Sequence, residues 1–212
     1  MTRDALQRQH QDAYCTVEEY LTLERVSEFK HEYLAGRIVS MAGASRAHNM
    51  ITGNVEQRLR NQLEEKPCET YSKDQRVKID SEHYYYPDVV VVCDEAHFES
   101  IEGLDTLTNP TVVIEVLSKS SASDDRGEKF YTYRNIESVK DYILIAQDKM
   151  HVEHFTRLPN NEWILHRDVT EPDGKIVIHS LGCELTLSQI YQRVDFPPQI
   201  KLLKEDDTTA EA

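Results

Sequence analysis

The sequence predicts an α/β fold in which a mixed β-sheet is flanked by helices, and three patterns support this prediction. Residues 86–93 and 112–117 are almost continuously apolar, which is typical of strands buried on both faces of a sheet. Residues 48–63 repeat apolar side chains at spacings of about four, as an amphipathic helix does. After residue 147, short alternating segments separated by turn signals predict a C-terminal antiparallel β-extension.

The N-terminal elements follow from local signals. Thr16, with a glutamate three residues later, has the pattern of a capping box and opens a short helix to about residue 23. Residues 26–34 have helical character, and this second helical stretch ends at Gly36. Residues 37–42 then alternate polar and apolar side chains, which predicts the first strand.

The middle of the chain predicts two further strands with a helix between them. Residues 75–79 and 141–146 are the strand candidates. Ser123 can cap the helix, because its first residues, Asp124 and Asp125, suit the positive end of the helix dipole. This helix is expected to continue through residue 134.

The β-extension is predicted from alternating segments and from the turns between them. Pro159-Asn160-Asn161 and Pro172-Asp173-Gly174 are the turn signals. The expected strands and a final short helix are residues 150–155, 163–167, 176–179 and 188–193.

The length of 212 residues fits a single domain that buries a sizeable core without disulfides or a structural metal. We expect this domain at residues 16–200, a flexible segment at residues 1–15 and a disordered acidic tail at residues 201–212. No run approaches the ~20 apolar residues that cross a bilayer, and the first residues have no apolar core like that of a secretory signal. A cytoplasmic location without a membrane partner is therefore expected by default.

Composition constrains the partners and the redox state. The net charge of -14 weighs against nucleic-acid binding, which needs a basic surface. The basic side chains that could line a groove, from Arg37 to Arg134, all lie in the first two thirds of the chain, which permits a local positive cleft. The four cysteines lie far apart without a C-x-x-C pair, which argues against zinc and against a disulfide framework and predicts reduced thiols.

A carboxylate interrupts the apolar run at residues 112–117. Glu115 is expected in a buried strand, where an ionised carboxylate costs several kcal/mol unless it is paired, bound to a cation or protonated. Asp88 enters the other apolar run directly after Pro87. Two acids on two such strands indicate a metal site.

These acids are part of a longer pattern. It consists, in chain order, of Glu32-Tyr33, Gly36, Met41, His48, Pro87-Asp88, Glu115-Val116-Leu117-Ser118, Asp125 and Lys129. With these elements the chain, from about residue 16 to residue 187, resembles the Uma-type putative restriction endonucleases of the PD-(D/E)XK nuclease superfamily. The resemblance implies a restriction-endonuclease-like fold, with the mixed central β-sheet flanked by helices and the C-terminal antiparallel β-extension.

The resemblance also implies the site and its cofactor. Asp88 and Glu115 would coordinate Mg²⁺, with Mn²⁺ as an alternative, and Glu32 would add a third, helix-borne carboxylate. Lys129 would position or deprotonate the water that attacks a DNA phosphodiester bond, so that Asp88, Glu115 and Lys129 are the expected catalytic residues. Hard oxygen ligands suit Mg²⁺, which keeps several waters and lowers the pKa of a bound water.

The chain departs from the superfamily pattern at Leu117, where a lysine is expected two residues after Glu115. The resemblance places the lysine at Lys129 on the following helix instead. Structural roles stay open beside the functional ones. Lys129 could form a surface ion pair with the acid four residues before it, and Glu115 could form a buried ion pair. Asp88 could be a turn residue after proline, and Glu32 could be a solvated acid on the surface of a helix.

Four further residues are expected to contact the substrate, namely His48, Ser118, Arg126 and Tyr133. His48 lies at a helix start near the site in the family pattern. Ser118 opens a loop that runs into a helix N-terminus, where backbone N–H groups favour a phosphate. Tyr133 lies four residues after Lys129 on the same helix face. The structural alternative for Ser118 is capping within the loop, and the alternative for Tyr133 is packing in the core.

Two functions from different classes are compatible with this sequence. The first is a Mg²⁺-dependent endodeoxyribonuclease with DNA as its partner, and a homodimer would suit cleavage of both strands. The second is a catalytically inactive binding or regulatory module on the nuclease fold, which the acidic charge and the absent strand lysine favour. Fold alone does not separate these functions.

Overall fold

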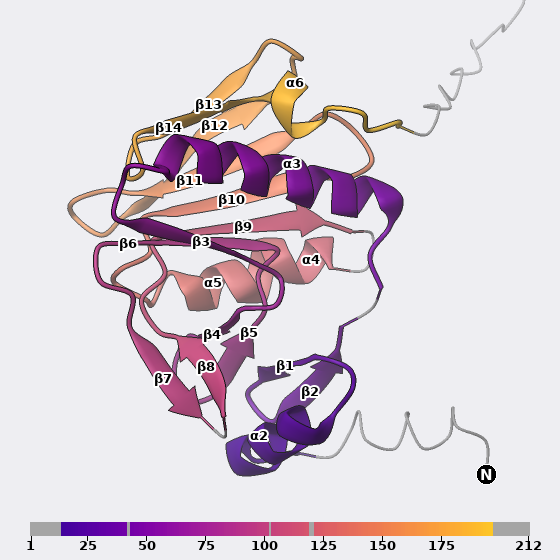
Figure 1. Cartoon of the computed structure of the whole chain (residues 1–212), viewed down its shortest axis with the longest axis vertical. Coiled ribbons are helices and arrows are strands. Elements are labelled where there is room, and N and C mark those ends of the chain that lie inside the picture. Colours follow the sequence, from indigo (N-terminus) through magenta and orange to yellow (C-terminus); the bar gives the residue numbers. More distant parts are fainter. Residues whose placement is uncertain (1–13, 42, 102, 119–120, 197–212) are drawn as a thin grey trace, which may run out of the picture.

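The structure, a computed structural model, describes residues 14–41, 43–101, 103–118 and 121–196. It contains two six-stranded mixed sheets and a small C-terminal antiparallel hairpin, where the sequence predicts one central sheet with an extension (Figure 1). The expected acidic tail and most of the expected flexible N-terminal segment lie outside the described residues. In the described ranges, no helix has the length and apolar character needed to cross a membrane.

The central sheet has the strand order β12-β11-β10-β9-β6-β3. Its strands are β3 (Cys68–Ser72), β6 (Val89–Cys93), β9 (Val112–Leu117), β10 (Asp141–Ala146), β11 (Val152–Arg157) and β12 (Trp163–Val169). β9 and β10 are parallel, and the other neighbours are antiparallel. The apolar runs of the sequence therefore form the middle of this sheet, as predicted. The first two strands of the expected β-extension belong to this sheet too, which corrects the prediction.

Strand periodicity divides the central sheet between two hydrophobic cores. Val112, Ile114 and Val116 face one core with α3 (Arg46–Leu63), while Val113 and Leu117 face the other. The first core is closed by the hairpin β13–β14 and α6, and the second by α4, η1 and α5 (Figure 1). These covering elements are β13 (Lys175–Ile178), β14 (Cys183–Thr186), α6 (Leu187–Ile190), α4 (Ala122–Asp124), η1 (Asp125–Lys129) and α5 (Phe130–Tyr133).

The second sheet has the strand order β2-β1-β5-β4-β8-β7 and lies below the central sheet in Figure 1. Its strands are β1 (His31–Leu34), β2 (Arg37–Ser40), β4 (Arg76–Lys78), β5 (His83–Tyr85), β7 (Phe98–Ile101) and β8 (Leu104–Leu107). Of these strands, the sequence predicts β2 and β4. All six strands have three or four residues, which is too short for a clear periodic pattern. The helix α2 (Val17–Val26) packs beside this sheet, and Thr16 forms the predicted capping box.

The second predicted helix, at residues 26–34, is wrong. β1 occupies its last four residues and pairs antiparallel with β2. Ala35 and Gly36 join the two strands with φ values of 44° and 95°, so both adopt the left-handed conformation of a tight hairpin turn. The glycine that the sequence suggested as a helix end is therefore a hairpin glycine. As a result, Glu32 lies on a strand and is not helix-borne.

The helix expected at residues 123–134 is interrupted by a π-helical turn. α4 starts after Ser121, which replaces Ser123 as the N-cap residue and makes no side-chain capping hydrogen bond. η1 then begins with Asp125 and ends with Lys129 before α5 continues. π-turns inside helices occur frequently at functional sites.

The thiols differ from the prediction. Cys68 and Cys93 lie opposite each other on β3 and β6 and form a disulfide, whereas Cys15 and Cys183 are free. A spacing of 25 residues gives no local signal for such a pair, because only the antiparallel register brings the two side chains together.

A buried polar network joins the central sheet to the C-terminal hairpin. Asp141, which is 1% exposed, lies 2.7 Å from Nε2 of His154 and accepts hydrogen bonds from Thr156 and Ser180. Burial by itself raises the pKa of this carboxyl, but the hydrogen bonds from His154 and Ser180 outweigh burial and lower it. The charged form of Asp141 therefore contributes to stability.

We expect Asp141→Asn to lower the free energy of unfolding at pH 7 by about 2 kcal/mol, since hydrogen bonds to a charged group are lost. Because the folded-state pKa lies below the unfolded value, this contribution is present above about pH 4 and disappears as the pH falls further. Urea unfolding of both proteins at pH 7 and pH 3 measures the difference. Asp148→Asn, at an exposed aspartate, is the control, and an equal loss in both variants would contradict the role of the network.

Candidate functional site

The candidate site forms where the N-terminal end of β6 meets the C-terminal half of β9. Val89 pairs with Ile114, so the antiparallel register brings Asp88 beside Glu115. The backbone N–H of Asp88 donates to Oε2 of Glu115 at 3.3 Å, and the N–H of Val116 donates to Oδ2 of Asp88 at 2.8 Å. The two predicted strand acids are thus neighbours that are held in place by backbone groups.

Lys129 lies among the carboxylates. Its Nζ is 2.8 Å from Oε1 of Glu32, 3.3 Å from Oδ1 of Asp125 and 3.6 Å from Oε1 of Glu115. Period 2 in β9 points Glu115 to the face covered by η1, and Lys129 ends that π-turn. The fold therefore brings the predicted lysine from the helix to the strand acids.

Glu32 reaches the cluster from the second sheet. It lies on β1, and its Oε1 accepts hydrogen bonds from Lys129 at 2.8 Å and from the backbone N–H of Tyr86 at 3.3 Å. Tyr86 comes directly after β5, which pairs with β1. One carboxylate oxygen thus connects the second sheet, the segment before Asp88 and the lysine.

His48 lies against Asp88. Its Nε2 is 2.7 Å from Oδ1 of Asp88, and its backbone N–H donates to the side chain of Ser45, the N-cap residue of α3. The N-terminal turn of α3 therefore places the imidazole of His48 against the Oδ1 atom of Asp88. The predicted site residue is next to the cluster, where it can orient Asp88.

The electrostatics of the site are dominated by excess negative charge. The five residues Glu32, Asp88, Glu115, Asp125 and Lys129 are each at most 9% exposed. Four buried carboxylates therefore share the site with a single lysine, and three of them lie within 3.6 Å of its Nζ. Burial raises the pKa of Glu115 well above its usual range, Lys129 opposes this, and the charges of Asp125 and Asp88 raise it further.

The pKa of Lys129 is raised as well, which in a lysine favours the charged form. Burial tends to lower the pKa of Lys129, but Glu115, Glu32 and Asp125 outweigh burial and raise it well above its usual range. An ammonium among several carboxylates is favoured in its charged form. The carboxylates around Lys129 therefore favour its ammonium form, which presents N–H donors.

The donor set fits a hard divalent cation, although the ligands are not yet arranged around one. Oε1 of Glu115 and Oδ1 of Asp125 are buried and accept no hydrogen bond, so two acceptor oxygens are unsatisfied. Among the residues that the structure describes, no three His, Cys, Asp or Glu side chains are already spaced as ligands around one point. In this arrangement the Lys129 ammonium supplies the positive charge that lies next to the carboxylates of Glu32, Glu115 and Asp125.

The sequence also predicts substrate contacts at Ser118, Arg126 and Tyr133. Ser118 hydrogen bonds to Ser121 within its loop, and the exposed Arg126 pairs with Glu153 on β11 at 2.7 Å. Tyr133 is fully buried in the second core, 5.5 Å from the ring of Tyr85. This position agrees with the alternative role, core packing, and the substrate contact of Tyr133 stays a prediction.

Asp125 joins the site, whereas the sequence places it in the family pattern without a role of its own beside a surface ion pair with Lys129. The spacing of four residues fits both a surface pair and an inward-facing pair. The apolar neighbours Phe130 and Tyr133 could have indicated which face of the helix is buried. Only the packing of η1 against β9 shows that Asp125 is internal, at 1% exposure.

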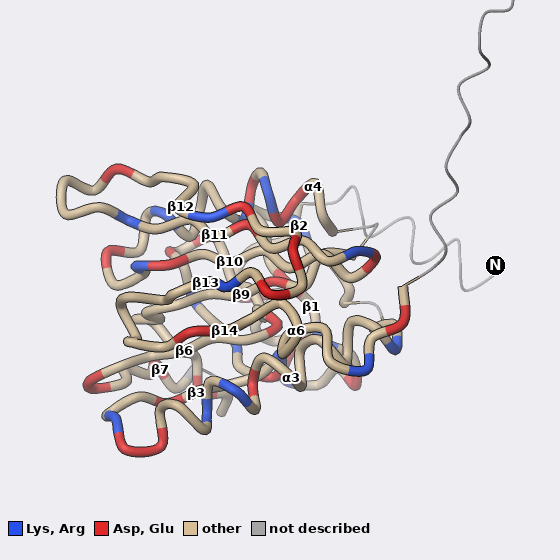
Figure 2. Tube along the Cα trace, turned by 90° about the horizontal axis from the view of Figure 1, so that it is seen from above, with Lys and Arg blue, Asp and Glu red and all other residues tan. Residues whose placement is uncertain are grey.

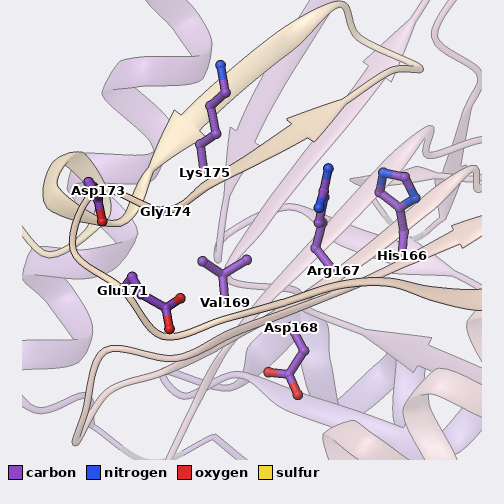
Figure 3. A pocket seen from close by; sticks show the side chains of 8 residues that line it. All are labelled: His166, Arg167, Asp168, Val169, Glu171, Asp173, Gly174 and Lys175. Carbon is purple, nitrogen blue, oxygen red and sulfur yellow. The ribbon is translucent and has the colours of Figure 1, made fainter.

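A pocket of about 460 Å³ lies elsewhere, beside β12 and the turn that leads to β13. Figure 3 shows the side chains of Lys175, Arg167 and His166 extending to one side of this pocket and Asp168 to the other. None of the predicted site residues lines it. The pocket is therefore separate from the acidic cluster.

The fold defines the class to which the protein belongs, that of mixed α/β proteins, and a solved structure shares this fold. A crystal structure from Anabaena variabilis, described as a putative nuclease belonging to DUF820, superposes with a TM-score of 0.69 over 84% of this chain and 97% of that chain, at 19% sequence identity. At this identity the likeness concerns the fold.

The chain belongs to the Uma2 family, described as "Putative restriction endonuclease", whose model matches residues 17–188. It is 37% identical over 151 residues to Uncharacterized protein sll1609 of Synechocystis sp., an alignment that covers 71% of this chain and 85% of that protein. It is also 29% identical over 180 residues to Uncharacterized protein slr1290 of the same organism, with coverage of 84% and 92%. The resemblance predicted from the sequence motifs is thus confirmed.

We expect Glu115→Gln to raise the melting temperature in EDTA by about 2–4 °C, because it removes one of the carboxylates that share Lys129. Added Mn²⁺ should then stabilise the wild-type protein more than the variant, since ligands stabilise the state that binds them. Circular dichroism melts with and without Mn²⁺ measure both effects.

The matched control is Glu95→Gln at an exposed glutamate, which should change neither value. A lower melting temperature of Glu115→Gln in EDTA, together with an unchanged response to Mn²⁺, would mean that Glu115 is a structural ion-pair partner of Lys129.

Proposed function

We propose that the protein is a metal-dependent endonuclease that hydrolyses DNA phosphodiester bonds. The observation that supports this function is the convergence of Glu32, Glu115 and Asp125 on Lys129, within 2.8–3.6 Å of its Nζ, directly beside Asp88. Such a concentration of buried acids costs folding free energy, so a role in chemistry is the simplest reason for it. Membership of the Uma2 family agrees with a nuclease.

In this proposal Asp88 and Glu115 hold Mg²⁺ or Mn²⁺, with Glu32 as a further acid beside them. The bound cation would offset negative charge on the phosphate and lower the pKa of a bound water. The backbone N–H groups of Asp88 and Val116 and the side chain of His48 keep the two carboxylates oriented. Preorganised carboxylates reduce the reorganisation needed when substrate arrives.

Lys129 acts in this proposal as a cationic donor. Hydrolysis joins a water oxygen to phosphorus and breaks the bond to the leaving sugar oxygen, which gains a proton. A permanently charged ammonium can orient that water or stabilise the negative phosphate oxygens. Of the two roles that the family resemblance implies, positioning therefore fits the carboxylate surroundings of Lys129 better than deprotonation does.

DNA binding by so acidic a protein requires local positive charge. Figure 2 shows acidic and basic residues interleaved along the chain, without one uniformly basic side. Arg126 lies three residues before Lys129, is 40% exposed and is held by Glu153. We propose that Arg126 contacts a backbone phosphate next to the site.

The alternative is an inactive binding or regulatory module on the same fold. The observation that favours it is the position of Lys129, whose ammonium already occupies the space between the carboxylates. Such a module would bind its partner equally well in EDTA and would cleave no DNA in any metal. The cleavage experiment below separates the two functions.

We expect Lys129→Ala to reduce cleavage of supercoiled plasmid in Mg²⁺ or Mn²⁺ by at least about 10²-fold, a magnitude usual for the loss of a positioned catalytic group. Wild-type cleavage should stop in EDTA. Agarose gel assays of both proteins, purified identically, measure these rates.

Lys149→Ala, at an exposed lysine, is the control for charge and for contaminating nucleases and should cleave at the wild-type rate. Retained cleavage in Lys129→Ala would remove the lysine from the mechanism. Absence of cleavage by every protein and on single-stranded DNA would favour the inactive module.

We expect Arg126→Ala to weaken DNA binding and to reduce the slope of log affinity against log salt by about 1, because one phosphate contact is lost. Fluorescence anisotropy in EDTA, where cleavage is absent, measures binding at several salt concentrations. Arg58→Ala on α3 has the same change in charge and should leave the slope unaltered. Equal slopes for wild type and Arg126→Ala would exclude this contact.

A further inference from the structure

Asp125 is the acid of the site that has no assigned role. It is 1% exposed and opens the π-turn η1, which Lys129 ends. Its carboxylate oxygen Oδ1 lies 3.3 Å from Nζ of Lys129 and accepts no hydrogen bond of good geometry. A buried carboxylate with an unsatisfied oxygen is costly, so its presence beside the lysine needs a reason.

The backbone of Asp125 is fixed independently of its side chain. The hydroxyl of Tyr142, on β10, donates to the Asp125 carbonyl at 2.8 Å, and the Asp125 N–H donates to the carbonyl of Ser121 at 2.9 Å. Tyr142 is fully buried, so this anchor belongs to the rigid second core. The backbone position of Asp125, from which its carboxylate reaches Lys129, is therefore held by contacts that do not involve the lysine.

The three partners of Lys129 differ in position. Glu32 and Asp125 are nearer to Nζ, at 2.8 and 3.3 Å, and Glu115 is farther, at 3.6 Å. Glu32 comes from the second sheet and Asp125 from η1, so the two nearer acids hold the ammonium from separate elements. Glu115, a proposed cation ligand, is the partner whose attraction for Lys129 would fall when a cation is bound.

We propose that Asp125 is a positioning residue that, together with Glu32, keeps the Lys129 ammonium at the reaction site when Glu115 is engaged elsewhere. This inference rests on the proposed nuclease function. Asp125 needs no contact with substrate in this role, because it acts through Lys129. A displacement of about 1 Å in a positioned group is enough to lower a rate about 10²-fold.

The test compares Asp125→Asn with Asp124→Asn, which makes the same change at the adjacent, exposed aspartate. The first readout needs no enzymatic activity. The rate at which an amine-reactive acylating reagent modifies Lys129 in the metal-free protein is measured by peptide mass spectrometry. Removal of one of its two near carboxylates should free the amine, and we expect acylation about tenfold faster in Asp125→Asn and unchanged in Asp124→Asn.

The second readout is cleavage under saturating metal and DNA. We expect kcat of Asp125→Asn to fall about 10²-fold with KM unchanged, since only the positioning of Lys129 is altered. The affinity for Mn²⁺, measured by calorimetry, should stay at the wild-type value. Asp124→Asn should match the wild-type protein in all three measurements.

Unchanged acylation of Lys129 in Asp125→Asn would overturn the proposal, and a tenfold loss of Mn²⁺ affinity would overturn it by making Asp125 a cation ligand. A wild-type protein that cleaves no DNA counts against the proposed function, while the acylation rates still decide the role of Asp125. If Asp125→Asn fails to fold, Tyr142→Phe keeps the carboxylate but removes its backbone anchor, and acylation should rise in the same direction. No rise in that variant would overturn the proposal.

Discussion

The buried ammonium of Lys129 among the carboxylates of Glu32, Glu115 and Asp125 is the interaction on which the arrangement of this protein depends. Each of these acids comes from a different element, and Lys129 ends a π-turn that must face β9 to reach them. Without the lysine, the acids would repel one another in a space with little water. The single cation thus allows two sheets and a helix to approach one another.

The alternation of β9 residues between the two cores decides which elements Glu115 can contact. Alternate residues of β9 point to opposite faces, so Glu115 must face either α3 or the helices after β9. It faces η1, where Lys129 is available, whereas Val116 and Ile114 face the apolar residues of α3. Asp88, just outside β6, is stabilised by the N–H of Val116 and by His48. The acids are therefore accommodated without loss of either apolar core.

An acidic cluster of this kind is unfavourable for stability and useful for cation and phosphate chemistry. Two of its oxygens, on Glu115 and Asp125, are left without hydrogen bonds, while both carboxylate oxygens of Asp141 have hydrogen-bond partners. Proteins usually tolerate unsatisfied buried groups where a ligand or a reaction uses them. The contrast distinguishes a structural carboxylate, Asp141, from the candidate functional ones.

The sequence by itself determined the central strands, the capped helix that starts at Thr16, the amphipathic helix at residues 48–63 and the choice of Asp88, Glu115 and Lys129 as candidate site residues, because local periodicity, caps and motif order depend on nearby residues. Only the tertiary structure decided that Glu32 lies on a strand, since a two-residue turn and a helix end can both use Gly36. The tertiary structure alone decided that Cys68 pairs with Cys93 and that the side chains of Asp125 and Tyr133 are buried. Strand register and the choice of the buried helix face depend on contacts between distant segments, which no local pattern records.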